Sequence, residues 1–320
     1  MKLSTYILSN LQPAQRNFLH QLRKYIFHKK VYPERQLFIL FIDGSMQHGG
    51  MADRFKSAVS AFAFCLHYNI PFRLKYTSPF ELSDYLVPNE YDWRLRKNEK
   101  ISYNFFEVKY ITDRMPEGLI RLRNLKTQKQ IHCLFYGDIV NALNNLNNTN
   151  YQWGELFKRL FRPAEALKNA IKQYQEKIDG DYVCAVFRFQ NLLGDFTEYQ
   201  YPEADENEKK KLISKCKNAL YKLQRRLSGE QKILVTSDSV TFLNAVRDVQ
   251  YVYVFPEKIV HIDNTSGEAH NVYLKSFIDF YLLSEGKVIY SIGTNQMYNT
   301  QFPMYAAKLN NIPFERIIIE

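Results

Sequence analysis

The chain has 320 residues, of which 46% are hydrophobic and 24% are charged, so it is long enough for more than one globular domain and its composition excludes a disordered or fibrous protein. Its formal net charge of +10 favours an anionic partner, such as a nucleic acid, an acidic lipid or a phosphorylated small molecule, without choosing among them. No apolar run reaches the roughly 18 residues of a membrane-spanning helix, and we expect neither such a helix nor a secretory signal. The four cysteines are scattered along the chain, so we expect free buried thiols and a cytoplasmic protein.

The first half of the chain begins with an amphipathic, basic segment at residues 13–28, for which a core-packed helix and a helix in contact with a membrane surface both remain open. The short apolar run at residues 36–42 predicts a buried parallel strand. A loop rich in glycine and histidine, a helix that begins near Ala52 and a second strand at residues 72–76 follow it. For residues 78–150 we expect irregular elaboration.

The second half alternates between strand and helix, after a helical segment at residues 153–174 that Pro163 is expected to break. Strands are predicted at residues 182–187, 232–236, 251–255, 287–292 and 317–319, and helices at residues 208–227, 240–246, 271–284 and 301–310. This alternation predicts a doubly wound, mainly parallel sheet. We therefore expect an α/β chain of two Rossmann-like domains, residues 1–165 and 166–320, that face a central cleft where ligands bind beyond the carboxyl ends of the strands.

The loop between the first predicted strand and helix carries the first candidate site. His48 precedes Gly49 and Gly50, which let the backbone approach a ligand, and the helix start offers unpaired N–H groups to an anion. Arg54 adds a guanidinium suited to a phosphate or a sugar hydroxyl, and His48 or Asp53 is a candidate to accept the proton of an acceptor hydroxyl. The alternative is a tight turn in which Asp53 only favours the helix dipole.

Arg188 follows the predicted strand at residues 182–187, so we expect it at the cleft. A guanidinium there binds two oxygens of a phosphate and stabilises the charge that builds on a diphosphate leaving group. The alternative is a surface arginine paired with Asp195. Asp179 and Asp181 form an Asp-x-Asp pattern, but it precedes a strand, so it predicts a turn and no metal site.

Ser237 and Asp238 follow the predicted strand at residues 232–236. Hydroxyl and carboxylate groups at that place are suited to capping the next helix. Contact with the ribose or the base of a nucleotide remains open beside that role.

Three polar residues near the end of the chain complete the set of candidates. Asp279 lies on the helix predicted at residues 271–284, where its carboxylate suits the two N–H donors of a guanine edge, and a solvated helix residue is the alternative. Thr294 and Asn295 follow a predicted strand and carry groups that hydrogen-bond phosphate oxygens.

The order of these pieces resembles the fucosyltransferase superfamily, which includes the nodulation, α-1,2-, α-1,6- and protein O-fucosyltransferases. The resemblance runs over nearly the whole chain. Its segments are residues 49–54 (GGMADR), where the family typically has Gly-Gly-Xaa-Gly-Asn-Arg, residues 186–188 (VFR) with the later Gly194 and Asp195, residues 235–238 (VTSD), residues 279–284 (DFYLLS), and Thr294 and Asn295 with Phe302. The chain departs from the family pattern at Ala52, Asp53 and Val186, where the family has Gly, Asn and His.

The resemblance implies a GT-B-like fold and a metal-independent, inverting glycosyltransferase that takes fucose, or a related sugar, from a GDP-sugar and needs no cofactor. It implies that Arg188 binds the β-phosphate, Asp279 the guanine, and Thr294 and Asn295 the phosphates, with Arg54 at the sugar and the acceptor. We expect the acceptor to be a glycan or a lipid-linked glycan of capsule or exopolysaccharide synthesis, reached by peripheral contact with the membrane surface.

A second hypothesis is a non-catalytic sugar-nucleotide-binding protein on the same fold, motivated by the departures at Ala52, Asp53 and Val186. Nucleic-acid binding is not expected, because the basic residues are dispersed along the sequence and no aromatic–basic module is present.

Overall fold

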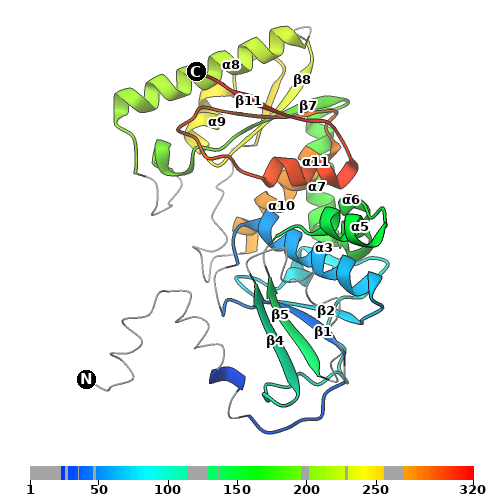
Figure 1. Ribbon diagram of the computed structural model, residues 1–320. Coiled ribbons are helices and arrows are strands. Elements are labelled where there is room, and N and C mark those ends of the chain that lie inside the picture. The colour runs from blue at the N-terminus through cyan, green and yellow to red at the C-terminus, as the bar shows by residue number, and fades with distance from the viewer. Residues whose placement is uncertain are drawn as a thin grey trace, which may run out of the picture. The chain divides into compact units, whose positions relative to one another are not determined.

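The computed structural model describes residues 23–25, 28–34, 36–45, 48–113, 129–135, 137–195, 202–227, 230–255 and 270–320 (Figure 1). These residues divide into two compact units. The first is drawn from residues 1–49, 53–81 and 88–152, and the second from residues 50–52, 82–87 and 153–320. The expected domains, residues 1–165 and 166–320, and the cleft between them stay predictions. Most of the helix expected at residues 13–28 lies outside the described residues.

A four-stranded sheet with the order β2-β1-β5-β4 forms the centre of the first unit. Its strands are β1 (Phe38–Ile42), β2 (Phe72–Tyr76), β4 (Val108–Asp113) and β5 (Gln130–Phe135), and each neighbouring pair is parallel. All of β1 is buried, as its apolar run predicts. The helix α3 (Met51–His67) connects β1 to β2 and packs Phe62 and Phe64 against Phe72 and Phe38. The predicted strand–loop–helix–strand unit is confirmed.

The expectation of irregular structure over residues 78–150 is wrong. The segment contains β4, β5, α5 (Val140–Asn147), the short helix η1 (Leu82–Asp84) and the short strand β3 (Leu86–Pro88). The polar residues Gln130 and His132 obscure the apolar pattern of β5, yet both are fully buried. The His132 ring makes its hydrogen bonds inside the unit, with Nε2 2.6 Å from Gln130 Oε1 and Nδ1 2.8 Å from the Tyr25 hydroxyl oxygen. Buried polar groups are tolerated where such partners exist.

The second unit is built on five parallel strands with the order β11-β10-β7-β8-β9. They are β7 (Tyr182–Phe187), β8 (Lys232–Ser237), β9 (Val252–Val254), β10 (Ile289–Gly293) and β11 (Phe314–Ile318). The chain runs outward from β7 to β8 and β9 and then places β10 and β11 on the other side of β7. This reversal creates a switch point between β7 and β10, which is where open parallel sheets bind ligands.

Helices alternate with these strands as the sequence predicts. They are α6 (Trp153–Leu160), α7 (Glu165–Ile178), the short η3 (Gln190–Leu193), α8 (Glu206–Arg226), α9 (Val240–Val246), α10 (His270–Glu285) and α11 (Phe302–Asn310). The strand β6 (Phe161–Pro163), which pairs with β3, separates α6 from α7, so the predicted break at Pro163 is confirmed.

The core of the second unit lies between its sheet and α8 and α9. The apolar face of α8, with Leu212, Cys216, Leu220 and Leu223, packs into a cluster with side chains of β7, β8 and β10. Figure 1 shows α8 lying along the outside of this unit. The four cysteines of the chain are free and buried, as expected.

Candidate active site

Polar side chains follow three neighbouring strands of the second sheet, β8, β7 and β10, at their carboxyl ends. Phe187 at the end of β7 is in register with Ser237 at the end of β8, so the next residues, Arg188 and Asp238, are neighbours. Val186 is in register with Ser291 of β10, which places Thr294 just beyond the end of the third strand. The candidate residues that follow these three strands in the sequence therefore lie along the same edge of the sheet, at its switch point.

Arg188 is held at this edge by Asp238. Its Nη1 lies 3.0 Å from Asp238 Oδ2, and the arginine side chain is 20% exposed while that of Asp238 is 2% exposed. The carboxylate also accepts hydrogen bonds from the backbone N–H groups of Phe189 (2.8 Å) and Gln190 (2.7 Å). Burial raises the pKa of Asp238, although Arg188 and the two backbone donors oppose that rise. The guanidinium is thus held by a buried carboxylate, and the arginine side chain keeps part of its surface in solvent.

Arg188 forms an ion pair with Asp238, and Asp195 makes its contacts elsewhere. Its Oδ2 accepts hydrogen bonds from Ser239 Oγ (3.0 Å) and Thr241 N (2.6 Å) at the start of α9, while Oδ1 is buried without a hydrogen-bond partner among the described residues. Ser239 caps α9 by accepting from Phe242 N at 3.0 Å. Ser237 Oγ accepts from Ser239 N at 3.1 Å. Capping is thus the role of Ser239, and Ser237 shapes the turn that leads to it.

The three late candidates have different surroundings. Asp279 is buried in α10 and forms an ion pair with Lys275, one turn earlier and equally buried, so the alternative of a solvated helix residue is wrong. Thr294 is buried, and its Oγ1 accepts a hydrogen bond from Gln296 N at 3.3 Å. Asn295 is exposed beside it. A guanine at Asp279 would share the carboxylate with Lys275.

The glycine loop of the first unit is braced from within. Arg54 is only 2% exposed and donates from Nε to Gly49 O (2.9 Å) and from Nη1 to Ser78 O (2.6 Å). Gly49 has φ +71°, and a Cβ there would lie 2.6 Å from Asp53 Oδ2, so glycine is required. Asp53 pairs with Lys56 at 2.5 Å.

Two further residues of this loop are His48 and Gly50. His48 is buried and accepts a hydrogen bond at Nε2 from Gly44 N at 3.1 Å, which leaves that nitrogen unprotonated in this arrangement. A Cβ at Gly50 would meet no atom within 4 Å. Of the two loop glycines, only Gly49 is needed for the shape of the backbone.

Sequence reasoning missed Asp43, the first residue beyond β1. Its Oδ1 accepts from Ser45 N (3.1 Å) and Ser45 Oγ (2.5 Å), and its Oδ2 lies 3.5 Å from Lys24 Nζ. Burial acts to raise its pKa, but the hydrogen bonds from Ser45 and the charge of Lys24 hold the pKa below its ordinary value. Arg188 was identified because it is a charged residue directly after a buried strand. The same rule applied to β1 identifies Asp43.

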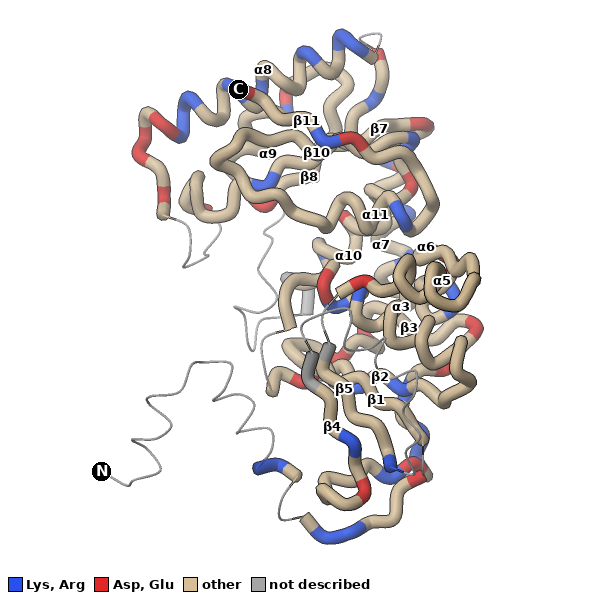
Figure 2. The backbone as a smooth tube through the Cα atoms, in the orientation of Figure 1, with Lys and Arg blue, Asp and Glu red and all other residues tan. Residues whose placement is uncertain are grey.

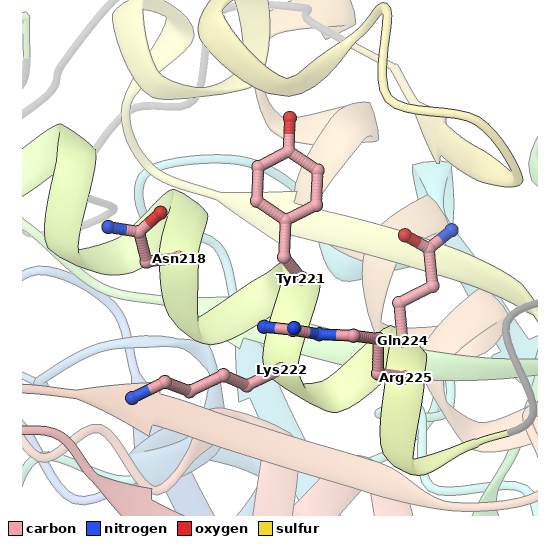
Figure 3. Close-up of a pocket in the computed structure, with 5 residues that line it drawn as sticks. All are labelled: Asn218, Tyr221, Lys222, Gln224 and Arg225. Carbon is pink, nitrogen blue, oxygen red and sulfur yellow. The ribbon is translucent and has the colours of Figure 1, made fainter.

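No group of three or more metal-binding side chains occurs among the residues that the structure describes. Asp179 is the C-cap of α7, in keeping with the predicted turn. Within that same described part, no helix combines the length and the apolar character needed to cross a membrane. A hollow of about 440 Å³ opens elsewhere, on α8 and not at the strand ends (Figure 3).

Comparisons with known proteins show the fold. No protein-family model matches the chain, and no curated protein sequence matches it. Its structure is similar to that of a mutant of FUT1 from Arabidopsis thaliana in complex with GDP, with a TM-score of 0.59 and 12% identity over 96% of this chain and 74% of that one. It is also similar to NodZ, an α-1,6-fucosyltransferase from Bradyrhizobium soaked with GDP-fucose, with a TM-score of 0.52 and 13% identity over 86% of this chain and 92% of that one. The expected α/β, mainly parallel, GT-B-like fold of fucosyltransferases is confirmed.

Proposed function

We propose that this chain is a glycosyltransferase that transfers fucose, or a related sugar, from a GDP-sugar to a glycan acceptor. The observation that carries the proposal is the anchored, partly exposed guanidinium of Arg188 at the switch point of the second sheet. The fold supports it, because the chain is similar to fucosyltransferase structures that hold GDP or GDP-fucose.

Arg188 is proposed to bind the β-phosphate of the donor. When the bond between the sugar C1 and the diphosphate oxygen breaks, negative charge builds on that oxygen, and a fixed cation stabilises it more in the transition state than in the ground state. Asp238 prevents the guanidinium from reorienting, since it is itself held by two backbone donors. Thr294 and Asn295 are proposed to hydrogen-bond the phosphates, and Asp279 to hold the guanine.

The acceptor oxygen forms the new bond to C1 on the face opposite the leaving group, which inverts the configuration. Its proton passes to a carboxylate, to an imidazole or to water. His48 and Asp53 remain the proposed bases, and the placement of Asp43 at the end of β1 adds a third candidate. In the proposed reaction the charge of Arg188 stabilises the diphosphate leaving group, and no metal or cofactor takes part.

Calorimetric titration with GDP, without added metal, tests the donor site. Wild-type protein is expected to bind GDP, and Arg188→Ala to bind it about 10-fold more weakly, since one charge-assisted contact is lost. Arg247→Ala is the matched control, because Arg247 is exposed on the same unit and bonds only Asn244 among the described residues. Absence of GDP binding by the wild-type protein would rule the proposal out.

A donor screen with GDP-fucose, GDP-mannose and UDP-sugars then separates the two hypotheses. Donor hydrolysis or transfer supports the enzyme. Binding of GDP without turnover of any donor would favour the non-catalytic binder, which the existing neutralisation of Arg188 by Asp238 also supports. Capsule or exopolysaccharide synthesis and a lipid-linked acceptor at the membrane surface remain part of the proposal, to be tested with purified glycan acceptors.

A further inference from the structure

Helix α8 has a local excess of basic residues. It carries six Lys and two Arg against two Glu, a formal net charge of +6 over 21 residues. Figure 2 shows basic residues along its length and acidic residues at its start. The acidic residues belong to its capping box, formed by Asp205 and Glu208, and favour the helix N-terminus. The rest of the helix is left strongly positive.

Four of these cations form a straight line on the solvent side. Lys211, Lys215, Lys222 and Arg225 are spaced at intervals of three, four or seven residues, with Asn218 completing the row, and all five residues are exposed. The row extends over about 21 Å at 1.5 Å per residue. The opposite side of α8 is buried in the core of the unit, so the helix lies flat on the protein and presents this row outward. We call these four cations the α8 row.

Of the four remaining cations of α8, Lys210 is exposed, and the other three are engaged within the protein. Lys209 pairs with Glu203 and Glu206, Lys217 donates to Ala245 O at 3.1 Å, and Arg226 pairs with Glu315 at 2.9 Å. Across the described residues, no member of the α8 row forms an ion pair with a carboxylate. The α8 row is therefore part of the positive charge that this helix presents to solvent.

The carboxyl-terminal half of the row borders an open hollow of about 440 Å³, lined by Asn218, Tyr221, Lys222, Gln224 and Arg225. Figure 3 shows the Lys222 and Arg225 side chains extending in the same direction, while Tyr221 is turned to another side of the helix. Tyr221 is 37% exposed. Two cations beside a hollow of this size suit a phosphate-bearing headgroup.

We propose that the α8 row is a docking surface for the anionic phospholipids of a membrane. A flat line of cations on a helix that lies along the protein matches a planar charged surface, and lysine stems reach outward while their charges stay in water. A polynucleotide is less well matched, because the row has no groove and no stack of aromatic side chains around it. The proposal stands on charge and exposure alone and does not depend on the proposed sugar transfer.

Vesicle co-sedimentation tests the assignment with the full chain. Wild-type protein is expected to bind vesicles that contain roughly one third phosphatidylglycerol in phosphatidylcholine, and not pure phosphatidylcholine, at about 0.1 M salt. The fourfold variant Lys211→Gln, Lys215→Gln, Lys222→Gln and Arg225→Gln is expected to bind the anionic vesicles at least about 10-fold more weakly.

The control has the same change of net charge at four other exposed lysines: Lys97→Gln, Lys109→Gln, Lys168→Gln and Lys172→Gln. It is expected to stay within about twofold of the wild-type protein. Equal loss in both variants would assign the effect to net charge and overturn the proposal. Unchanged vesicle binding by the α8 variant would also overturn the proposal. The same holds if a single-stranded oligonucleotide displaces the wild-type protein from vesicles and the α8 variant no longer binds that oligonucleotide. Unaltered GDP binding in both variants would separate this surface from the donor site.

Discussion

Each of the two units places an arginine near the carboxyl ends of buried parallel strands, but the two guanidinium groups have different surroundings. Arg54 is almost fully buried, and it donates to the carbonyls of Gly49 and Ser78. Arg188 has a carboxylate partner, Asp238, and keeps part of its side chain in solvent. The carbonyl contacts of Arg54 brace the loop in which it lies, whereas Arg188 is more exposed. The same residue type at the same kind of place can therefore have different surroundings.

The largest expected effect concerns catalysis. Arg188→Ala is expected to lower kcat for sugar transfer by about 100- to 1000-fold, since one preorganised donor to the developing charge is lost. The measurement is the initial rate of product formation at saturating donor. Arg247→Ala, on the same unit, should leave kcat within about twofold. If Arg188→Ala retained its kcat, the guanidinium would not act on the leaving group.

The second effect concerns the stability of the first unit. Arg54→Ala is expected to lower the free energy of unfolding by about 3 kcal/mol, because a buried side chain is lost and two partly buried carbonyls lose a charged donor. The two tryptophans of the chain separate the units, with Trp93 in the first and Trp153 in the second. Urea denaturation followed by fluorescence in a Trp153→Phe background therefore reports on the first unit.

Arg94 provides the control for this change. It is exposed and its ion pair with Asp92 is exposed as well, so Arg94→Ala should alter the free energy of unfolding by less than about 0.5 kcal/mol. A loss at Arg54 no larger than at Arg94 would mean that the buried guanidinium does not brace the glycine loop.

A third, smaller effect is a difference in stability between alanine substitutions at the two adjacent glycines of that loop. Gly49→Ala is expected to cost about 2 kcal/mol, because its φ is +71° and the new Cβ would meet Asp53. Gly50→Ala is expected to change the free energy of unfolding by less than about 0.5 kcal/mol, since its Cβ would have open space. Gly49 is grouped with the first unit and Gly50 with the second, so urea denaturation is followed by the fluorescence of both tryptophans. Equal losses of stability in the two variants would show that the positive φ of Gly49 does not require glycine.

The last prediction uses pH. Burial, and to a lesser extent Lys24 and Lys75, lower the pKa of His132 to about 3. An imidazole whose pKa is lower in the folded than in the unfolded state stabilises the fold above pH 6.5, and this stability is lost as the pH falls toward 3. The free energy of unfolding of the first unit is expected to drop by about 1.4 kcal/mol per pH unit in that window. The slope should become shallower in His132→Asn, and an unchanged slope would show that other groups cause the acid sensitivity.

Sequence patterns predicted the strands β1 and β7 because each is a continuous apolar run, and continuous apolar runs of this length belong to strands buried on both faces. They missed β5, where His132 and Gln130 are polar and yet buried. The partner of His132 is Tyr25, which lies 107 positions away in the sequence. A local pattern contains no information about a partner at that distance.

For the candidate site, the positions of Arg188, Ser237 and Thr294 after strands were readable from the sequence, since a strand's end is a local property. The ion pair of Arg188 with Asp238, rather than with Asp195, was not readable. It depends on the one-to-one register of β7 with β8, which brings residues 188 and 238 together across the sheet. The burial of Arg54 depends likewise on Ser78, which belongs to another turn of the chain.

The amino-acid sequence by itself determined the alternation of strands and helices, the apolar side of α8 and the residues that stand at strand ends, because each of these follows from local periodicity and composition. Only the tertiary structure decided which of those residues meet, which arginine is the more exposed, and that the four cations of the α8 row have no carboxylate partners among the described residues. The physical reason is that the pairing and burial of a charged group depend on side chains brought close by strand register and helix packing, and these lie far apart along the chain.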